Sequence, residues 1–170
     1  ASVMVASLEG SGSGVAFHNG RSVFVWTDAH VVEDTKRTRT IIDPRSGQPK
    51  VAVTFVDVNL LQDVVEDGRK VGEESRLAKV IRYSERHDLA LLRVHGGSWP
   101  KKGVQFLKAG DIPSPGEPLW HVGSMHGKHG CGSLADGVFS NAGRLRRNFE
   151  ATDVLEPVIY DQVSLNACHP

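Results

Sequence analysis

The sequence has little of the features that would assign it to a specialised class of protein. It contains only two cysteines, too few for a disulfide framework, and this leaves the redox compartment and the cellular location open. Its 20 basic and 20 acidic residues cancel, so no global field attracts nucleic acid or an anionic membrane. No apolar run is long enough to span a bilayer, and no signal-like apolar core follows Ala1. We therefore expect neither a nucleic-acid partner nor a membrane span.

What is present is an ordinary globular composition divided into many short apolar segments. Hydrophobic residues make up 39% of the chain and charged residues 24%, with little helical periodicity of useful length. Short strands separated by turn residues indicate an all-β barrel or sandwich. The segments that we expect to be strands are 2–8, 14–18, 23–27, 51–58, 60–65, 77–83, 89–94, 119–122, 137–140 and 154–163, with 51–58 and 60–65 forming a pair. The basic and threonine-rich stretch 36–40 is expected to be a solvated strand face.

Glycine-rich and proline-rich stretches punctuate these segments. The alternating glycines of Gly10–Gly14 predict a tight turn with close backbone packing rather than a phosphate loop, because a strand-like run follows them. Asn19-Gly20 and Asp67-Gly68 predict hairpin turns. The glycines and Trp99-Pro100 between 96 and 102 indicate a boundary. We predict an N-terminal β-barrel over 1–96, a linker over 97–117 and a partial C-terminal β-barrel over 118–170.

Two titratable residues stand at the ends of predicted strands. His30 follows the apolar run Val23–Thr27, and Asp88 opens the apolar run Leu89–Val94, 58 positions later. A histidine held by a rigid strand can act as a base, and an aspartate can fix its tautomer and stabilise the imidazolium. Taken singly, each residue also has a plainer interpretation. The histidine could bond a backbone carbonyl, and the aspartate could cap the start of a strand.

The motifs around both residues resemble those of the trypsin-like (chymotrypsin-fold) serine proteases. Thr27-Asp28-Ala29-His30 is similar to the family's Thr-Ala-x-His motif, and His87-Asp88-Leu89-Ala90-Leu91-Leu92 resembles its Asp-x-Ala-Leu-Leu strand. Gly12-Ser13-Gly14-Val15 resembles the strand that precedes the histidine in the HtrA/Deg-like and glutamyl-endopeptidase-like branch. Pro118–Gly123 and Asp136–Ser140 resemble strands of the second barrel, so the resemblance covers nearly the whole chain.

The resemblance implies two antiparallel β-barrels and hydrolysis of a protein or peptide substrate through an acyl-enzyme. His30 would be the general base, and Asp88 would orient it. The family's nucleophile motif, Gly-x-Ser-Gly-Gly, does not occur in the sequence. The segment Val163–Pro170 resembles the run into that motif and ends about three residues before the expected nucleophile.

We therefore expect the second barrel to be incomplete in this chain. On this interpretation the chain is inactive alone, and its partner is the missing C-terminal segment of its own barrel. Two alternatives remain open. The chain could be a catalytically inactive, protease-like binding or scaffold module, or a viral-type cysteine protease if the missing nucleophile is a cysteine.

Histidines and cysteines cluster in the second half of the chain. His126, His129, Cys131 and Cys168 could supply four ligands to a structural zinc ion. A Cys131–Cys168 disulfide, or histidines that only form hydrogen bonds, would explain the same residues. Because the ligand spacing is irregular, we predict no metal and no cofactor, with these four residues as the zinc candidates.

Overall fold

The computed structural model describes residues 2–96, 99–100, 102–108, 110–123, 133–146 and 158–165. Within these residues the chain consists of strands and one 3-10 helix, which confirms the predicted all-β class. The elements are β1 (Ser2–Ala6), β2 (Ser11–Asn19), β3 (Ser22–Thr27), η1 (His30–Thr35), β4 (Lys36–Ile42), β5 (Pro49–Phe55), β6 (Val58–Glu66), β7 (Arg69–Ser84), β8 (Leu89–Val94), β9 (Pro118–Gly123), β10 (Ser133–Arg146) and β11 (Val158–Leu165).

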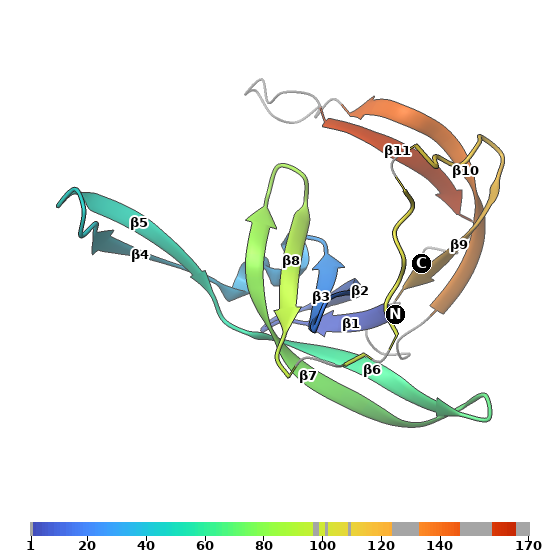
Figure 1. Cartoon of the computed structure of the whole chain (residues 1–170), viewed down its shortest axis with the longest axis horizontal. Coiled ribbons are helices and arrows are strands. Elements are labelled where there is room, and N and C mark those ends of the chain that lie inside the picture. Colours follow the sequence, from blue (N-terminus) through green and yellow to red (C-terminus); the bar gives the residue numbers. More distant parts are fainter. Residues whose placement is uncertain are drawn as a thin grey trace. The chain divides into compact units, whose positions relative to one another are not determined.

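The first compact unit comprises Ala1–Val104 and Gly123–Gly132 and is built around a closed barrel. Its strand order is β1-β2-β3-β8-β7-β6, and the barrel closes where β1 pairs with β6 (Figure 1). Every pairing in it is antiparallel. Closure leaves the barrel strands without an exposed sheet edge over most of their length.

Period-two alternation fills the barrel with small branched side chains. Buried and partly exposed residues alternate strictly along β1 and β3, so that Val3, Val5, Val23 and Val25 point into the core. Leu92 of β8 joins them, fully buried. Each such side chain contributes about 1.5–3 kcal/mol by leaving water, and this burial fixes the strand ends on which the candidate site lies.

The second unit comprises Gln105–Val122 and Ser133–Pro170. Its described residues form a three-stranded sheet in the order β11-β10-β9, in which β10 and β11 pair antiparallel. The sheet is open, so the second barrel is incomplete in this chain, as predicted. Residues Trp99 to Val104 still belong to the first unit, since Trp99 packs in its core and the Val104 N–H donates to the Ala16 carbonyl. The division into 1–96, 97–117 and 118–170 stays a prediction.

The predicted pairing of 51–58 with 60–65 is wrong. β5 ends at Phe55 and pairs with β4 in a separate two-stranded sheet, and Val58 already belongs to β6. β6 pairs with β1 and β7 instead. The stretch 36–40 is indeed an exposed strand, but its charged side chains gave no apolar pattern from which its partner could be predicted.

The glycine-rich segment is a strand rather than a turn. The chain turns at Ser7–Gly10, and β2 begins at Ser11. The predicted close packing is confirmed, because a Cβ atom on Gly12 would collide with the side chain of Val31 in η1. The second hairpin turn agrees with its prediction: Asp67 and Gly68 both have positive φ, at 50° and 76°.

Candidate active site

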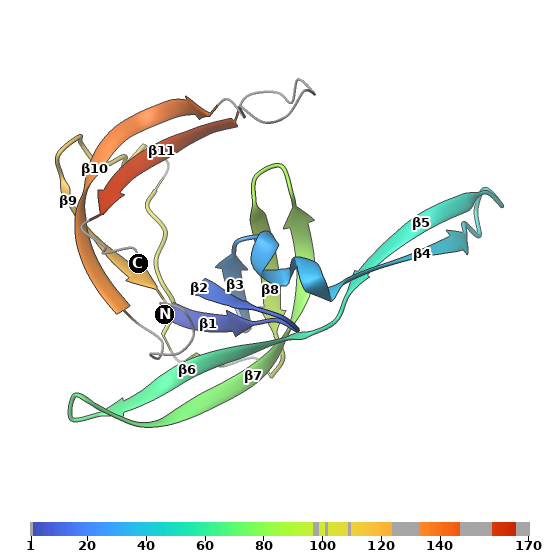
Figure 2. The same cartoon turned by 180° about the vertical axis from the view of Figure 1, so that it is seen from behind.

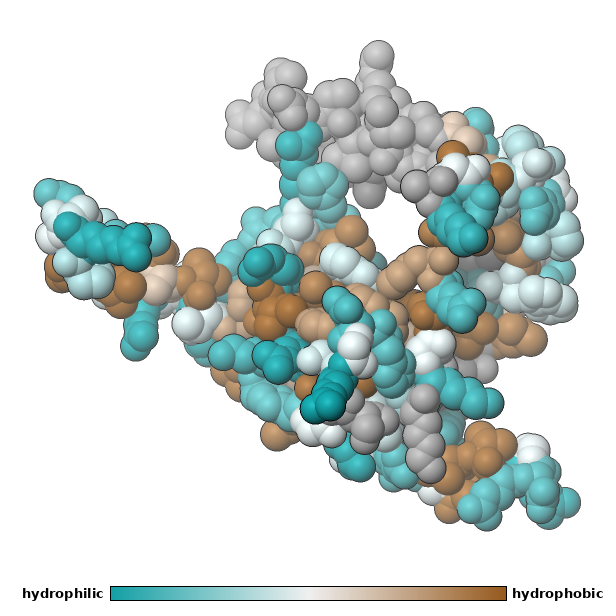
Figure 3. Space-filling view, in the orientation of Figure 1, coloured by the Kyte–Doolittle hydropathy of each residue, from teal (hydrophilic) through white to brown (hydrophobic). Residues whose placement is uncertain are grey.

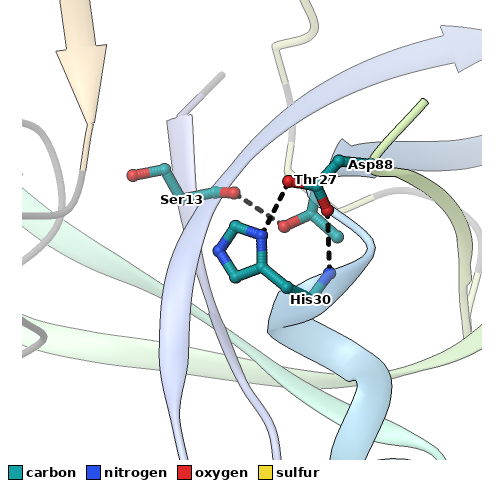
Figure 4. Close-up of polar contacts among 4 residues, drawn as sticks. All are labelled: Ser13, Thr27, His30 and Asp88. Atoms are coloured by element: carbon teal, nitrogen blue, oxygen red, sulfur yellow. Dashed lines mark hydrogen bonds and ion pairs between the residues drawn. The ribbon is translucent and has the colours of Figure 1, made fainter. Parts of the chain in front are cut away.

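Thr27, the last residue of the core strand β3, is held in a fixed position. Thr27 is buried, and its hydroxyl donates a 2.8 Å hydrogen bond to the carbonyl of Ser13 on β2 (Figure 4). The same residue pairs with Ala90 in the ladder between β3 and β8. The end of β3 is therefore held from both sides before the chain reaches His30.

The short helix η1 then carries His30 at its first position. Val31 and Val32 are buried, and the Thr35 hydroxyl donates to the Val32 carbonyl at 2.6 Å. Gly12 leaves the space that Val31 occupies. The buried valines and the space at Gly12 thus fix the position of η1, and with it the direction in which the His30 side chain leaves the backbone.

Asp88 stands in a tight turn immediately before β8. Its N–H donates to the Glu85 carbonyl at 3.2 Å, and its φ of 50° lies in the left-handed region. Aspartate tolerates this region better than most residues, although it still costs about 1–2 kcal/mol. In this backbone conformation the carboxylate of Asp88 contacts His30, the first residue of η1.

The structure brings His30 and Asp88 together at two points of contact. Oδ2 of Asp88 lies 2.8 Å from Nδ1 of His30, and Oδ1 accepts the backbone N–H of His30 at 3.0 Å (Figure 4). The 58-residue separation is explained by the ladder, because the end of β3 and the start of β8 are antiparallel neighbours. Both side chains remain half-exposed or more, at 64% for His30 and 50% for Asp88.

This arrangement fixes the tautomer of the imidazole. Burial by itself would raise the pKa of Asp88, but hydrogen bonds from the backbone and the ring of His30 outweigh it and hold that pKa below the ordinary aspartate value. An ionised carboxylate can only accept at Nδ1, so a neutral His30 carries its proton on Nδ1 and a lone pair on Nε2. A free Nε2 is the atom from which a histidine acts as a base.

A second carboxylate, Asp28, lies close to this pair. Neighbouring protein atoms displace part of its hydration and raise its pKa, and repulsion from Asp88 raises it further, while His30 lowers it. Asp28 nevertheless remains exposed as a whole residue. Its place in the Thr-Asp-Ala-His motif was visible in the sequence, but nothing in that motif indicated its electrostatic coupling to Asp88.

A further histidine–aspartate pair was not predicted from the sequence. His95 Nε2 lies 2.9 Å from Oδ2 of Asp57. His95 follows the last residue of β8 whereas Asp88 precedes the first, so the strand separates them by about 20 Å. This pair therefore does not take part in the site at His30.

The zinc candidates His126, His129, Cys131 and Cys168 lie outside the described residues. Among the residues that are described, no group of three or more histidine, cysteine or acidic side chains could hold a metal ion. The described part of the chain also contains no helix that is long and apolar enough to cross a membrane.

Comparison with known proteins gives a family and a fold. The model of the trypsin-like peptidase domain matches residues 12–166. The crystal structure of Deg5 superimposes with a TM-score of 0.54 at 19% identity, over 84% of this chain, which spans 58% of the Deg5 chain. The MamO protease domain from Magnetospirillum magneticum, in its apo form, gives a TM-score of 0.52 at 16% identity, over 100% of this chain and 72% of that one. Comparison with curated protein sequences gives no match.

The family match begins in β2 and ends beyond β11, so it includes both motifs that hold His30 and Asp88. At under 20% identity the two solved structures add the fold alone. They agree with the closed barrel described above. The chain belongs to the trypsin-like peptidase family.

Proposed function

We propose that this protein is a serine endopeptidase in which His30 is the general base and Asp88 its orienting partner. The observation that carries the proposal is the two-point contact of Asp88 with the ring and the backbone N–H of His30. A single salt bridge between exposed side chains would be weak evidence, because such pairs are common and contribute little. Here the bond to Nδ1 sets the tautomer, and the bond to the backbone N–H of His30 fixes the carboxylate relative to η1.

The chemistry follows from the free Nε2 of His30. In the acylation step Nε2 takes the proton of a nucleophilic hydroxyl as its oxygen attacks the scissile carbonyl carbon, and the imidazolium then gives that proton to the leaving amine. Water repeats the sequence in deacylation and releases the acid. Asp88 stays ionised throughout and stabilises the imidazolium, which its lowered pKa favours.

The nucleophile in this proposal is a serine in a Gly-x-Ser-Gly-Gly segment that is not among the 170 residues. The backbone N–H groups of that segment would form the oxyanion hole. By itself the chain is then inactive, and its first partner is the segment that completes the second barrel. The open sheet of β9, β10 and β11 supports this part of the proposal, since an unpaired sheet edge invites a further strand.

A catalytically inactive, protease-like binding module is the second candidate. The observation that favours it is that no Gly-x-Ser-Gly-Gly occurs in the sequence. The coding sequence after Pro170 discriminates between the two, because it either encodes that motif or does not. A cysteine in the serine position would instead indicate a cysteine protease.

The experiment is to label the full-length gene product with a fluorophosphonate, which reacts with activated serines. We expect labelling that depends on His30, with His30→Ala lowering the labelling rate by at least about 10³-fold. Ser84→Ala is the matched control and should label at the wild-type rate. Ser84 is the last residue of β7, close to Asp88, and within the described residues its hydroxyl bonds His87. Labelling that is unchanged in His30→Ala would refute the proposed role.

A further inference from the structure

The hairpin of β4 and β5 is a basic surface on a chain without net charge. It runs directly on from η1 and extends away from the barrel (Figures 1 and 2). Between Lys36 and Phe55 the sequence has five basic residues, Lys36, Arg37, Arg39, Arg45 and Lys50, and one acidic residue, Asp43. Within the described residues an ion pair forms at Lys36, and none forms at the other four basic side chains.

The register gives this hairpin two chemically different faces. Thr38 pairs with Val53 and Thr40 with Val51, so these side chains share one face. The opposite face carries Arg37, Arg39 and Lys50. The valines are exposed, Val51 at 63% and Val53 at 48%, and hydrophobic and hydrophilic surfaces lie side by side on the hairpin in Figure 3. One face is thus apolar and the other cationic.

The outer edge of β5 has hydrogen-bonding groups available. The Val56 N–H donates to the Thr35 carbonyl at 2.9 Å, and because hydrogen-bonded pairs alternate in an antiparallel ladder, the even-numbered residues of β5 bond β4. The N–H and C=O groups of Val51 and Val53 therefore point outward. Among the described strands, β5 pairs with β4 alone.

This edge borders an open groove of about 380 Å³, lined by residues 53–55 of β5 and 79–83 of β7. Lys79 and Arg82 add two more cations to its wall. Charge, exposed apolar surface and free backbone groups therefore meet at one edge.

The base of the β4–β5 hairpin continues directly from η1, which carries His30, and it also contacts the turn that holds Asp88. Lys36, at the start of β4, forms an ion pair with Glu85 in the turn that holds Asp88, and its ammonium lies 5.2 Å from the centre of the Tyr83 ring. The Phe55 ring, at the end of β5, packs on Tyr83 with ring centroids 5.0 Å apart. A polypeptide bound along β5 is consequently anchored close to the turn of Asp88.

We propose that the outer edge of β5 binds an extended acidic segment of a protein substrate as a third strand of the β4–β5 sheet. This deepens the proposed function by naming a substrate class. Side chains alternate across an added strand, so those on the side of Val51 and Val53 would be apolar and those on the side of Arg37 and Arg39 acidic. Backbone bonds to β5 supply affinity, and the cations supply selectivity and faster association.

A peptide fits this surface better than a nucleic acid. Single-stranded nucleic acids need aromatic platforms for stacking, and the single aromatic residue of the hairpin, Phe55, already packs on Tyr83. The exposed valines and the free strand edge would serve no purpose against a phosphate backbone. A strand of alternating acidic and apolar residues matches the basic side chains, the exposed valines and the free strand edge together.

The first experiment measures binding of fluorescein-labelled (Glu-Val)₄ to the His30→Ala protein by fluorescence anisotropy. We expect binding that weakens with salt and that is absent for (Lys-Val)₄ and much weaker for Glu₄Val₄, which has the same composition without the alternation. Charge reversal of Arg37 and Arg39 to Glu should weaken it at least about tenfold. The matched control reverses Arg21 and Arg69, exposed at other turns of the barrel, and should change it less than about twofold.

The second experiment tests the edge itself. Val53→Pro removes an outward N–H, whereas Thr38→Pro removes the corresponding N–H on the outer edge of β4, directly across the hairpin. We expect Val53→Pro to abolish peptide binding and Thr38→Pro to preserve it. Equal loss in both variants, equal binding of Glu₄Val₄, or displacement of the peptide by an equimolar single-stranded DNA oligonucleotide would each overturn the inference.

These outcomes separate the inference from the proposed function. Binding is measured in a variant without the proposed base, so it does not depend on catalysis. If the serine-directed label fails while (Glu-Val)₄ binds as expected, the β5 edge stands as a peptide-binding surface and only the enzymatic proposal falls. If labelling succeeds and the peptide does not bind, this inference alone is overturned.

Discussion

Replacing Asp88 by asparagine inverts the hydrogen bonding at the ring of His30 and leaves most of the site intact. The amide oxygen of asparagine still accepts the backbone N–H of His30, which lies 3.0 Å from Oδ1 in the native protein. The amide NH₂ then faces Nδ1, 2.8 Å away, and donates to it. The imidazole must therefore carry its proton on Nε2, so the atom that should accept a proton already holds one.

The expected magnitude follows from this inversion. We expect kcat to fall by about 10⁴-fold, as for the same change in the Ser-His-Asp triads for which it is known, with little effect on substrate affinity. The fold should change little, because asparagine also tolerates the φ of 50° at this position. Asp88→Ala is the contrasting variant. This variant loses both hydrogen bonds and places alanine in the left-handed region, so its free energy of unfolding should be lower by about 1–3 kcal/mol.

The assay is single-turnover cleavage of a peptide ester by the full-length protein, with thermal unfolding measured in parallel. Retention of kcat within about tenfold in Asp88→Asn would refute the tautomer argument, whatever its effect on stability. A pH series adds an independent check. Because the pKa of Asp88 is lowered by folding, its ionised form stabilises the native protein above about pH 4, and that gain is lost as the pH falls through the lowered value. The stability difference from Asp88→Asn should shrink over the same range.

Two further substitutions test the surroundings of the dyad. Gly12→Ala should destabilise the protein by about 1–3 kcal/mol because the new Cβ meets Val31, and the double variant with Val31→Ala should recover part of the loss in both thermal unfolding and turnover. No recovery would mean that Gly12 does not act through η1. Asp28→Asn should raise the melting temperature at pH 7, since folding raises the pKa of Asp28 and its ionised form therefore costs stability there. The gain should vanish as the pH falls below about 4, where both states are protonated, and a gain that persists at pH 3 would contradict the assignment.

The sequence predicted the elements that obey a strong local rule. Val23–Thr27 alternates between core and outer face, and Asp67-Gly68 has the two residues that tolerate positive φ in a hairpin turn. The meeting of His30 and Asp88 could be predicted as well, but only from the resemblance of two motifs. Spacing alone could not have placed them together, since ladder register and not chain distance sets their separation.

Other features depended on tertiary register, which the sequence does not encode locally. The two apolar runs predict 60–65 as the partner of β5, yet β5 pairs with the basic strand β4. The alternating glycines predict a turn at Gly12, whereas Gly12 is a strand residue that accommodates Val31, 19 positions later in the chain. In both cases the deciding contact lies outside the window in which a pattern can be recognised.

His30 and Asp88 both belong to the unit of the closed barrel. His30 lies just after β3 and Asp88 just before β8, and these two strands are neighbours held by the buried core. The proton-accepting half of the proposed machinery is therefore preassembled by one folding unit. The contacts that hold His30 and Asp88 together all lie within that unit. Regulation that works by rearranging the two units would then alter the delivery of the nucleophile and leave the strength of the base unchanged.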